Sequence, residues 1–104
     1  MSDEEILHVI STADEHKKIQ TLKASKNRLT NFGMINLFSY LGNCANLNLS
    51  YNQLTEEILD EIIRLRSSMK HLKILNLTQN KIINERKAKI KVEELKKIGI
   101  IVTI

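Results

Sequence analysis

Apolar and polar positions follow one another in this chain in a phrase that occurs three times. The phrase reads apolar-x-x-apolar-x-apolar-x-x-Asn-x-apolar, and its copies begin at Ile19, Cys44 and Leu72. The second and third copies contain the stretches LNLSYNQL and LNLTQNKI, which begin 28 residues apart. Repetition at a fixed interval of this length is typical of stacked structural units that bury their apolar faces against one another. The pattern therefore predicts a solenoid.

Each phrase is expected to contain a short strand followed by a bend. In the LNL tripeptides at 47–49 and 75–77, apolar and polar residues alternate with the period of two that defines a strand. The Leu side chains are expected to face a core and the intervening Asn side chains to face outward. The first copy, with Leu22 and Ala24 in the same slots, predicts a third strand.

The segments between these strands have helical periodicity. In residues 55–72 the apolar positions step by three and four and so line one face of a helix. That helix is expected to begin at Thr55, a hydroxyl cap followed by acidic residues. The residues predicted to point inward from this helix are Ile58, Ile62, Leu65 and Met69. A shorter helix is expected over 30–43, with inward residues Phe32, Ile35, Phe38 or Ser39, and Leu41.

The C-terminal segment is open to more than one interpretation. Residues 84–97 carry a helical stripe of Ala88, Val92 and Leu95, although AKIKV also alternates like a strand, and we expect a helix. A fourth strand is expected within IGIIVTI at 98–104. Its apolar slots are either Leu95, Ile98 and Ile100 or, in a poorer register, Ile98, Ile101 and Thr103.

Crossovers of 23 to 28 residues return the chain in the same direction, so the strands should be parallel. The phrase as a whole resembles the leucine-rich repeat, LxxLxLxxNxL, over residues 19–104, and the 28-residue cycle is similar to the ribonuclease-inhibitor-like, cytosolic subtype. This resemblance implies an α/β fold: a short right-handed solenoid of about four parallel strands on the concave side, with helices on the convex side. Members of the family bind proteins, regulate GTPases, scaffold assemblies and in some cases bind RNA.

Residues 1–104 are expected to form a single domain, in which residues 19–104 supply about four repeats. Residues 1–18 lie outside the repeat pattern and have the character of an amphipathic helix, with Ser2 and Glu5 placed as a capping box. We predict that this N-terminal capping helix covers the open end of the first repeat.

The repeated asparagines are expected to have a structural role. Each falls where the chain leaves a strand, and a side-chain amide there can bond the backbone groups of the bend. This structural column consists of Asn27, Asn52 and Asn80.

Binding residues should come from the outward positions between the apolar slots. They present long polar side chains, basic groups and one Tyr, and Tyr and Arg are frequent in the energetic centres of interfaces. The small residues Ser25, Ser50 and Thr78 form a column among them. The predicted partner-binding residues of the concave face are Lys23, Lys26, Arg28, Asn48, Tyr51, Gln53, Asn76, Gln79 and Lys81.

The net charge of +4 is unevenly distributed. The segment from Lys81 to Lys97 has seven Lys or Arg against three Glu and alone carries +4. Such a segment attracts acidic protein partners or a phosphate backbone. The leading hypothesis is thus a non-enzymatic protein-binding module whose protein partner is acidic, and the alternative is nucleic-acid (RNA) binding through Lys81–Lys97.

The last strand carries no charged side chain and is strongly β-prone. Its free edge predicts association of a partner or of a second copy, with Ile101 and Ile104 exposed there.

Other chemistries are not indicated. The three His residues and the single Cys44 show no metal-ligand spacing, and no phosphate-binding loop or catalytic triad is recognisable, so we expect no metal, cofactor or enzymatic activity. Cys44 fills an apolar slot and should be buried. No apolar run is long enough to span a membrane. The acidic N-terminus and the lone cysteine favour the cytoplasm, with the nucleus as the alternative.

Overall fold

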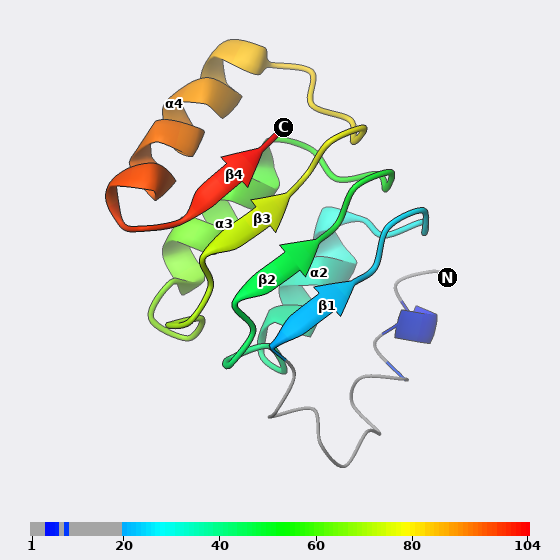
Figure 1. Ribbon diagram of the computed structural model, residues 1–104. Helices are drawn as coiled ribbons and strands as arrows, with labels where there is room; N and C mark the ends of the chain where they lie inside the picture. Colours follow the sequence, from blue (N-terminus) through cyan, green and yellow to red (C-terminus); the bar gives the residue numbers. More distant parts are fainter. Residues whose placement is uncertain (1–3, 7, 9–19) are drawn as a thin grey trace.

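The computed structural model describes residues 4–6, 8 and 20–104 of the chain. Four parallel strands form one sheet in the order β1-β2-β3-β4. The strands are β1 (Thr21–Lys23), β2 (Asn46–Asn48), β3 (Ile74–Asn76) and β4 (Ile101–Thr103). The helices between them are α2 (Asn31–Phe38), α3 (Glu57–Leu65) and α4 (Glu85–Lys97), and they lie on one side of the sheet (Figure 1). The predicted α/β class with four parallel strands is confirmed.

The core lies between the sheet and the helix layer. The central apolar slots Leu47, Leu49, Leu75 and Leu77 are fully buried, and Ala24 is 2% exposed. Cys44 is also fully buried, as its apolar slot predicts. Repetition of one buried slot in every unit makes the core continuous from repeat to repeat, because no unit can bury its apolar face alone.

Most residues predicted to point inward from the helices are buried or half-buried, with one exception in α2. Ile58, Ile62 and Met69 are buried as predicted for α3 and the turn that follows it. In α2, however, Phe32 is 77% exposed, and the prediction that it points inward is wrong. Thr30 caps this helix by accepting from the Gly33 N–H (3.5 Å), and the buried residues are Gly33, Met34, Leu37 and Phe38.

The predicted cap of α3 is also corrected. The cap position is Glu56, and the hydroxyl of Thr55 donates to Glu57 Oε2 (2.7 Å) instead of capping the backbone. Asn84 caps α4 by accepting from the Lys87 N–H (3.0 Å), so the ambiguous segment is a helix as expected.

Neither predicted register of the last strand is correct. Val102 pairs with Leu75, so Val102 and not Ile98 or Ile101 occupies the central apolar slot. The Ile100 N–H donates to Leu95 O (2.9 Å) and the Gly99 N–H to Lys96 O (3.1 Å), with Gly99 at φ +91°. This arrangement is the Schellman motif that ends helices at a glycine. It fixes the start of β4, and Leu95 therefore belongs to the helix, where it is fully buried.

Most of the predicted capping helix over 1–18 lies outside the described residues, as does Ile19, the first slot of the first repeat. Within it, residues 4–6 and 8 are helical, and Ile6 is buried with the main core. The extent of this cap stays a prediction.

Candidate functional site

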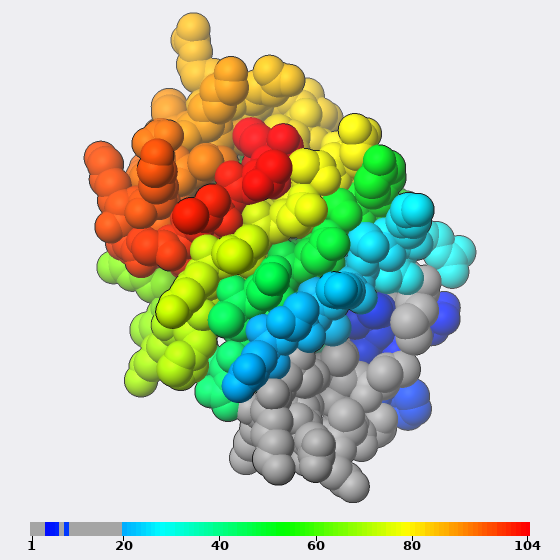
Figure 2. All heavy atoms as spheres, viewed as in Figure 1, coloured from blue at the N-terminus to red at the C-terminus, as the bar shows by residue number. Residues whose placement is uncertain are grey.

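The exposed face of the sheet, which we call the sheet face, carries two columns of side chains in register. Parallel pairing aligns equivalent residues of successive strands, and alternate residues of each strand point away from the core. Figure 2 views this face, on which the strands lie side by side. The first column is Thr21, Asn46, Ile74 and Ile101, and the second is Lys23, Asn48, Asn76 and Thr103.

The first column was missed by sequence reasoning, which took outward positions only from inside the strand phrase. It places Ile74 and Ile101 next to each other as paired residues of β3 and β4. Their side chains are 47% and 62% exposed. Two adjacent β-branched residues on a rigid surface form an apolar spot at the β4 end of the sheet face. The signal was present in the alternation of Ile74 with the buried Leu75.

The second column is more restrained than predicted. Asn48 Oδ1 accepts from the Ser50 N–H (3.1 Å) and the Ser50 hydroxyl (2.8 Å). Asn76 Oδ1 accepts in the same way from the N–H (3.0 Å) and hydroxyl (2.9 Å) of Thr78. The hydroxyl groups of Ser50 and Thr78 thus fix the two amide side chains in place. Ser50 is only 6% exposed, so a partner has little access to it. The second column ends at Thr103 of β4.

A third row stands where each strand ends. Lys26, Tyr51 and Gln79 all have positive φ, between 58° and 59°. This left-handed conformation is costly for residues other than glycine. The Lys26 N–H donates to Ser50 O (3.0 Å) and the Tyr51 N–H to Thr78 O (2.9 Å), so neighbouring repeats hold the turn in place. The Lys26 ammonium lies 5.8 Å from the centroid of the half-exposed Tyr51 ring, within cation–π range.

The remaining predicted residues lie beyond the turns. Arg28 Nη2 is 3.8 Å from Glu5 Oε1, in an exposed ion pair. Gln53 and Lys81 are exposed, and their backbone N–H groups donate to the preceding repeat, at Leu29 O (2.9 Å) and Leu54 O (2.7 Å). The turn row and the residues beyond it therefore form one rim along the end of the sheet where the strands exit.

The asparagine column lies beneath this rim. Asn52 accepts from the Leu29 N–H (3.1 Å), and its Nδ2 donates to Ala24 O (2.9 Å), Leu49 O (3.1 Å) and Ser50 O (3.2 Å). Asn80 repeats the pattern one unit later, accepting from the Leu54 N–H (3.0 Å) and donating to Leu49 O (2.8 Å). Asn27 donates to Ala24 O (2.9 Å) and Ser25 O (3.2 Å). All three amides bond the backbone, and those of Asn52 and Asn80 also link their repeat to the preceding one.

The charge of the sheet face is of one sign. The four strand segments with their exits, residues 20–28, 46–53, 73–81 and 100–104, contain no Asp or Glu. The same segments carry five basic side chains: Lys23, Lys26, Arg28, Lys73 and Lys81. The carboxylates of α3 and α4 lie in the other layer, so this face presents a positive field with an apolar spot at one end.

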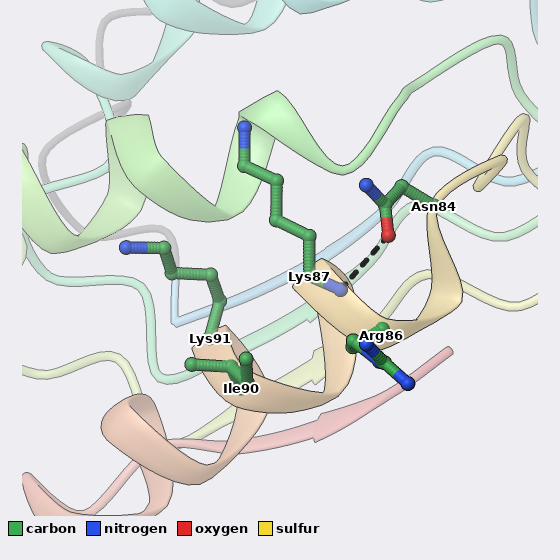
Figure 3. A pocket seen from close by; sticks show the side chains of 5 residues that line it. All are labelled: Asn84, Arg86, Lys87, Ile90 and Lys91. Atoms are coloured by element: carbon green, nitrogen blue, oxygen red, sulfur yellow. Dashed lines mark hydrogen bonds between the residues drawn. The ribbon is translucent and has the colours of Figure 1, made fainter.

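The basic segment Lys81–Lys97 is partly neutralised. Lys87 Nζ lies 3.5 Å from Asp60 Oδ2, and Lys91 Nζ lies 3.1 Å from Asp60 Oδ1. Lys87 also reaches Glu57 (3.8 Å), and Lys91 reaches Glu94 (3.7 Å). Figure 3 shows both ammonium groups extending toward α3, beside a shallow pocket lined by Asn84, Arg86, Lys87, Ile90 and Lys91. The hydrogen bond with Asp60 raises the pKa of Lys91, which keeps it charged.

Ile101 and Ile104 are 62% and 39% exposed. Ile101 belongs to the sheet face, whereas Ile104 lines a small hollow with Ile82, Glu85 and Lys89. The two residues thus serve different surfaces at the same end of the molecule.

No other chemistry is assembled within the described residues. They contain no group of three or more His, Cys, Asp or Glu side chains close enough to hold a metal ion. Burial raises the pKa of the Cys44 thiol, which donates to Asn46 O (3.4 Å), so this cysteine is a poor nucleophile. None of the helices in this part of the chain is both long and apolar enough to cross a membrane.

Comparison with known proteins yields one match. The family model for the Leucine Rich Repeat matches residues 43–65, which hold β2, its asparagine turn and all of α3. Neither a curated protein nor a solved structure gives a match. The strand of the matched segment, β2, lies between β1 and β3 in the four-stranded parallel sheet, so parallel strands continue on both sides of it.

Proposed function

The chain is a leucine-rich-repeat protein, and from this premise we propose that it is a non-enzymatic protein-binding module that takes its partner on the sheet face. The partner is a protein segment that combines acidic with apolar side chains. The ribonuclease-inhibitor-like subtype and a cytoplasmic location are parts of the same proposal and rest on the repeat length and the lone cysteine.

One observation carries the proposal: the strand segments and exits that form the sheet face contain no Asp or Glu, and they present an exposed isoleucine pair. These segments carry five basic side chains, of which Arg28 is paired with Glu5, while the carboxylates of α3 and α4 lie in the helix layer. Such a face repels basic surfaces and accelerates encounters with acidic ones. The pair Ile74–Ile101 adds apolar area that a partner can remove from water, worth about 1.5–3 kcal/mol for a fully buried side chain.

The construction of the face supports recognition of a fixed shape. The amides of Asn48 and Asn76 are oriented by Ser50 and Thr78 before any partner arrives. A surface that is already ordered loses less conformational entropy on binding. Tyr51 is half exposed at the centre of the exit rim, with Lys26 beside it, and is the natural aromatic anchor.

Nucleic-acid binding through Lys81–Lys97 is the weaker alternative. Two of the seven basic residues of that segment, Lys87 and Lys91, are already paired with carboxylates of Glu57, Asp60 and Glu94. Single-stranded nucleic acids also rely on stacking platforms, and aromatic residues make up only 4% of the chain. Steep loss of binding with rising salt would favour this alternative, because phosphate contacts release counterions.

The test uses peptides selected against the intact protein from a random-sequence library. We expect the selected peptides to be rich in Asp, Glu and large apolar residues. Ile74→Asn introduces the side chain that Asn46 places in the same column one repeat earlier, and it should weaken the best peptide about tenfold. The double change Tyr51→Ala with Lys81→Glu should weaken binding further.

The matched control is Ile83→Asn, because Ile83 is 84% exposed but lies outside the sheet face. Its affinity for the peptide should equal that of the unchanged protein. Equal losses from Ile74→Asn and Ile83→Asn, or selection of peptides without acidic residues, would contradict the proposed site.

A further inference from the structure

A second basic surface lies at the end of the sheet where the strands begin, opposite the exit rim. The turn from α3 to β3 (residues 66–73) and the turn from α4 to β4 (residues 96–100) lie at this end (Figure 1). The Ile101 N–H donates to Lys73 O (2.8 Å), which joins the two turns where their strands start. Figure 2 shows both turns, yellow-green and orange-red, along the same edge of the molecule. We call this surface, formed by residues 66–73 and 96–100, the entry edge.

The charged side chains of the entry edge are all basic. Its two turns contain five Lys or Arg residues and no Asp or Glu. Within the part of the chain that the structure describes, these five side chains form no ion pair, in contrast to Lys87 and Lys91. All five are exposed: Arg66, Lys70, Lys73, Lys96 and Lys97.

The carboxylates that come just before the two turns in sequence leave this charge largely in place. Glu61 accepts a hydrogen bond from Arg64 Nε (3.0 Å), and Glu94 lies 3.7 Å from Lys91 Nζ. Glu93 is exposed one helical turn before Lys97 and lowers the positive potential on one side of the edge only. The entry edge therefore retains an excess of positive charge, which attracts anionic surfaces.

An exposed aliphatic side chain stands among these cations. Ile98 lies between Lys97 and Gly99 in the second turn and is 45% exposed. At a bilayer surface, an apolar side chain reaches the boundary of the acyl chains while neighbouring lysines stay at the headgroups. The two turns contain no Phe, Tyr or Trp on which a nucleic-acid base could stack. The composition of the edge thus favours a lipid surface over a single-stranded nucleic acid.

We propose that the entry edge docks on the surface of a bilayer that contains anionic phospholipids. Clusters of about four to eight Lys or Arg side chains are sufficient to hold a protein at such a surface. In this orientation the exit rim points away from the bilayer and the sheet face stays open to a partner. Only Lys73 borders both surfaces, so membrane docking does not depend on the peptide binding proposed above.

Cosedimentation of the full chain with lipid vesicles tests the docking. We expect binding to vesicles of phosphatidylcholine and phosphatidylserine in about a 2:1 ratio, none to pure phosphatidylcholine, and a loss of binding as salt rises. Lys96→Glu with Lys97→Glu should lower the partition coefficient at least about tenfold. Arg66→Glu with Lys70→Glu should lower it to a similar extent, because the two turns form one surface. Ile98→Ser should cause a smaller loss, about threefold.

The matched control is Arg86→Glu with Lys89→Glu, in the first half of the same helix. This variant and the Lys96/Lys97 variant both lower the net charge from +4 to zero, so a difference between them reports the position of the cations. Lys89 lies about 10 Å along α4 from Lys96, and the control should keep most of its vesicle binding. Circular dichroism establishes that each variant is folded.

Three results would overturn the proposal. The first is no binding of the unchanged protein to the mixed vesicles, and the second is an equal loss in the control and in either entry-edge variant. The third is binding to single-stranded RNA, but not to vesicles, that both entry-edge variants abolish, which would assign the edge to a phosphate backbone. Peptide binding on the sheet face is measured separately, and it should persist in the Lys96/Lys97 variant.

Discussion

At the scale of single residues, the asparagine column couples each repeat to the one before it. Asn52 holds Ala24 O and the Leu29 N–H of the preceding repeat together with Leu49 O of its own. Asn80 does the same one repeat later. The repeated asparagine therefore stabilises the stacking of repeats as well as the bend, because its side-chain amide both donates to and accepts from backbone groups of two neighbouring repeats.

Replacing Asn52 by Leu should lower the free energy of unfolding by about 1–3 kcal/mol, because it leaves buried backbone groups unpaired. Chemical denaturation followed by circular dichroism measures the change. Gln53→Leu, at the exposed neighbouring position, is the control and should alter stability far less. Equal stability of Asn52→Leu and the wild type would rule out the linking role of this amide.

The sequence predicts inward and outward positions at this scale but not what the outward side chains bond. Asn48 and Asn76 were expected to be free for a partner, and their Oδ1 atoms are instead held by Ser50 and Thr78. Two polar side chains at positions i and i+2 can bond each other or point to solvent. The pattern of apolar positions is the same in both cases, so it cannot predict which of the two occurs.

At the scale of elements, the junction between α4 and β4 shows why one register was missed. In IGIIVTI the fully apolar alternating set is Ile98, Ile100, Val102 and Ile104, so period two predicts which face is buried but not which of these residues pairs with Leu75. The decision comes from the Schellman motif, in which Gly99 takes a positive φ and Ile100 packs inward at 4% exposure. The existence of the strand was predictable from composition, whereas its register follows from how the helix ends.

Gly99→Ala should destabilise the protein by about 1–2 kcal/mol, because φ +91° is unfavourable for a residue with a Cβ. An added Cβ meets no atom within 4 Å, so the cost is one of backbone conformation alone. Thermal unfolding measures it, and Gly99→Asn should be the milder change because Asn tolerates positive φ better. Wild-type stability in Gly99→Ala would contradict the proposed origin of the register.

The loop before α4 is held by a buried carboxylate of the preceding repeat. Glu56 Oε2 accepts from the Ile83 N–H (3.2 Å) and Oε1 from the Asn84 N–H (3.2 Å). Its own backbone N–H and those of Ile83 and Asn84, with the charge of Lys87, hold the pKa of Glu56 below its ordinary value against the opposing effect of burial. The ionised carboxylate is thus favoured by folding.

We predict that this contribution to stability is present above the unfolded pKa of Glu56 and is lost as the pH falls through the lower folded value. Glu56→Gln should be less stable than wild type at neutral pH, and the difference should shrink in acid. Unfolding measured across this pH range checks it, with the exposed Glu4→Gln as the control. A difference that grows in acid would contradict the assigned sign.

At the scale of the whole molecule, the repeats create a surface that no single unit contains. The fold was predictable because the same apolar slots return in each unit and parallel crossovers align them. The sheet face was only partly predictable, because Ile74 and Ile101 are far apart in sequence and become neighbours through the register of β4. The four strand segments also contain no Asp or Glu, but this makes a face without these residues only once the sheet brings the strands side by side.

The most direct test of binding on the sheet face is a titration of the ¹⁵N-labelled protein with the strongest selected acidic–apolar peptide. Amide shifts in the NMR spectrum report which backbone the peptide contacts. We expect the largest shifts along the sheet face and its exit rim, at Lys23, Asn48, Tyr51, Ile74 and Ile101, with α4 nearly unchanged. Shifts concentrated on the outer residues of α4, such as Arg86 and Ile90, with a silent sheet face, would contradict it.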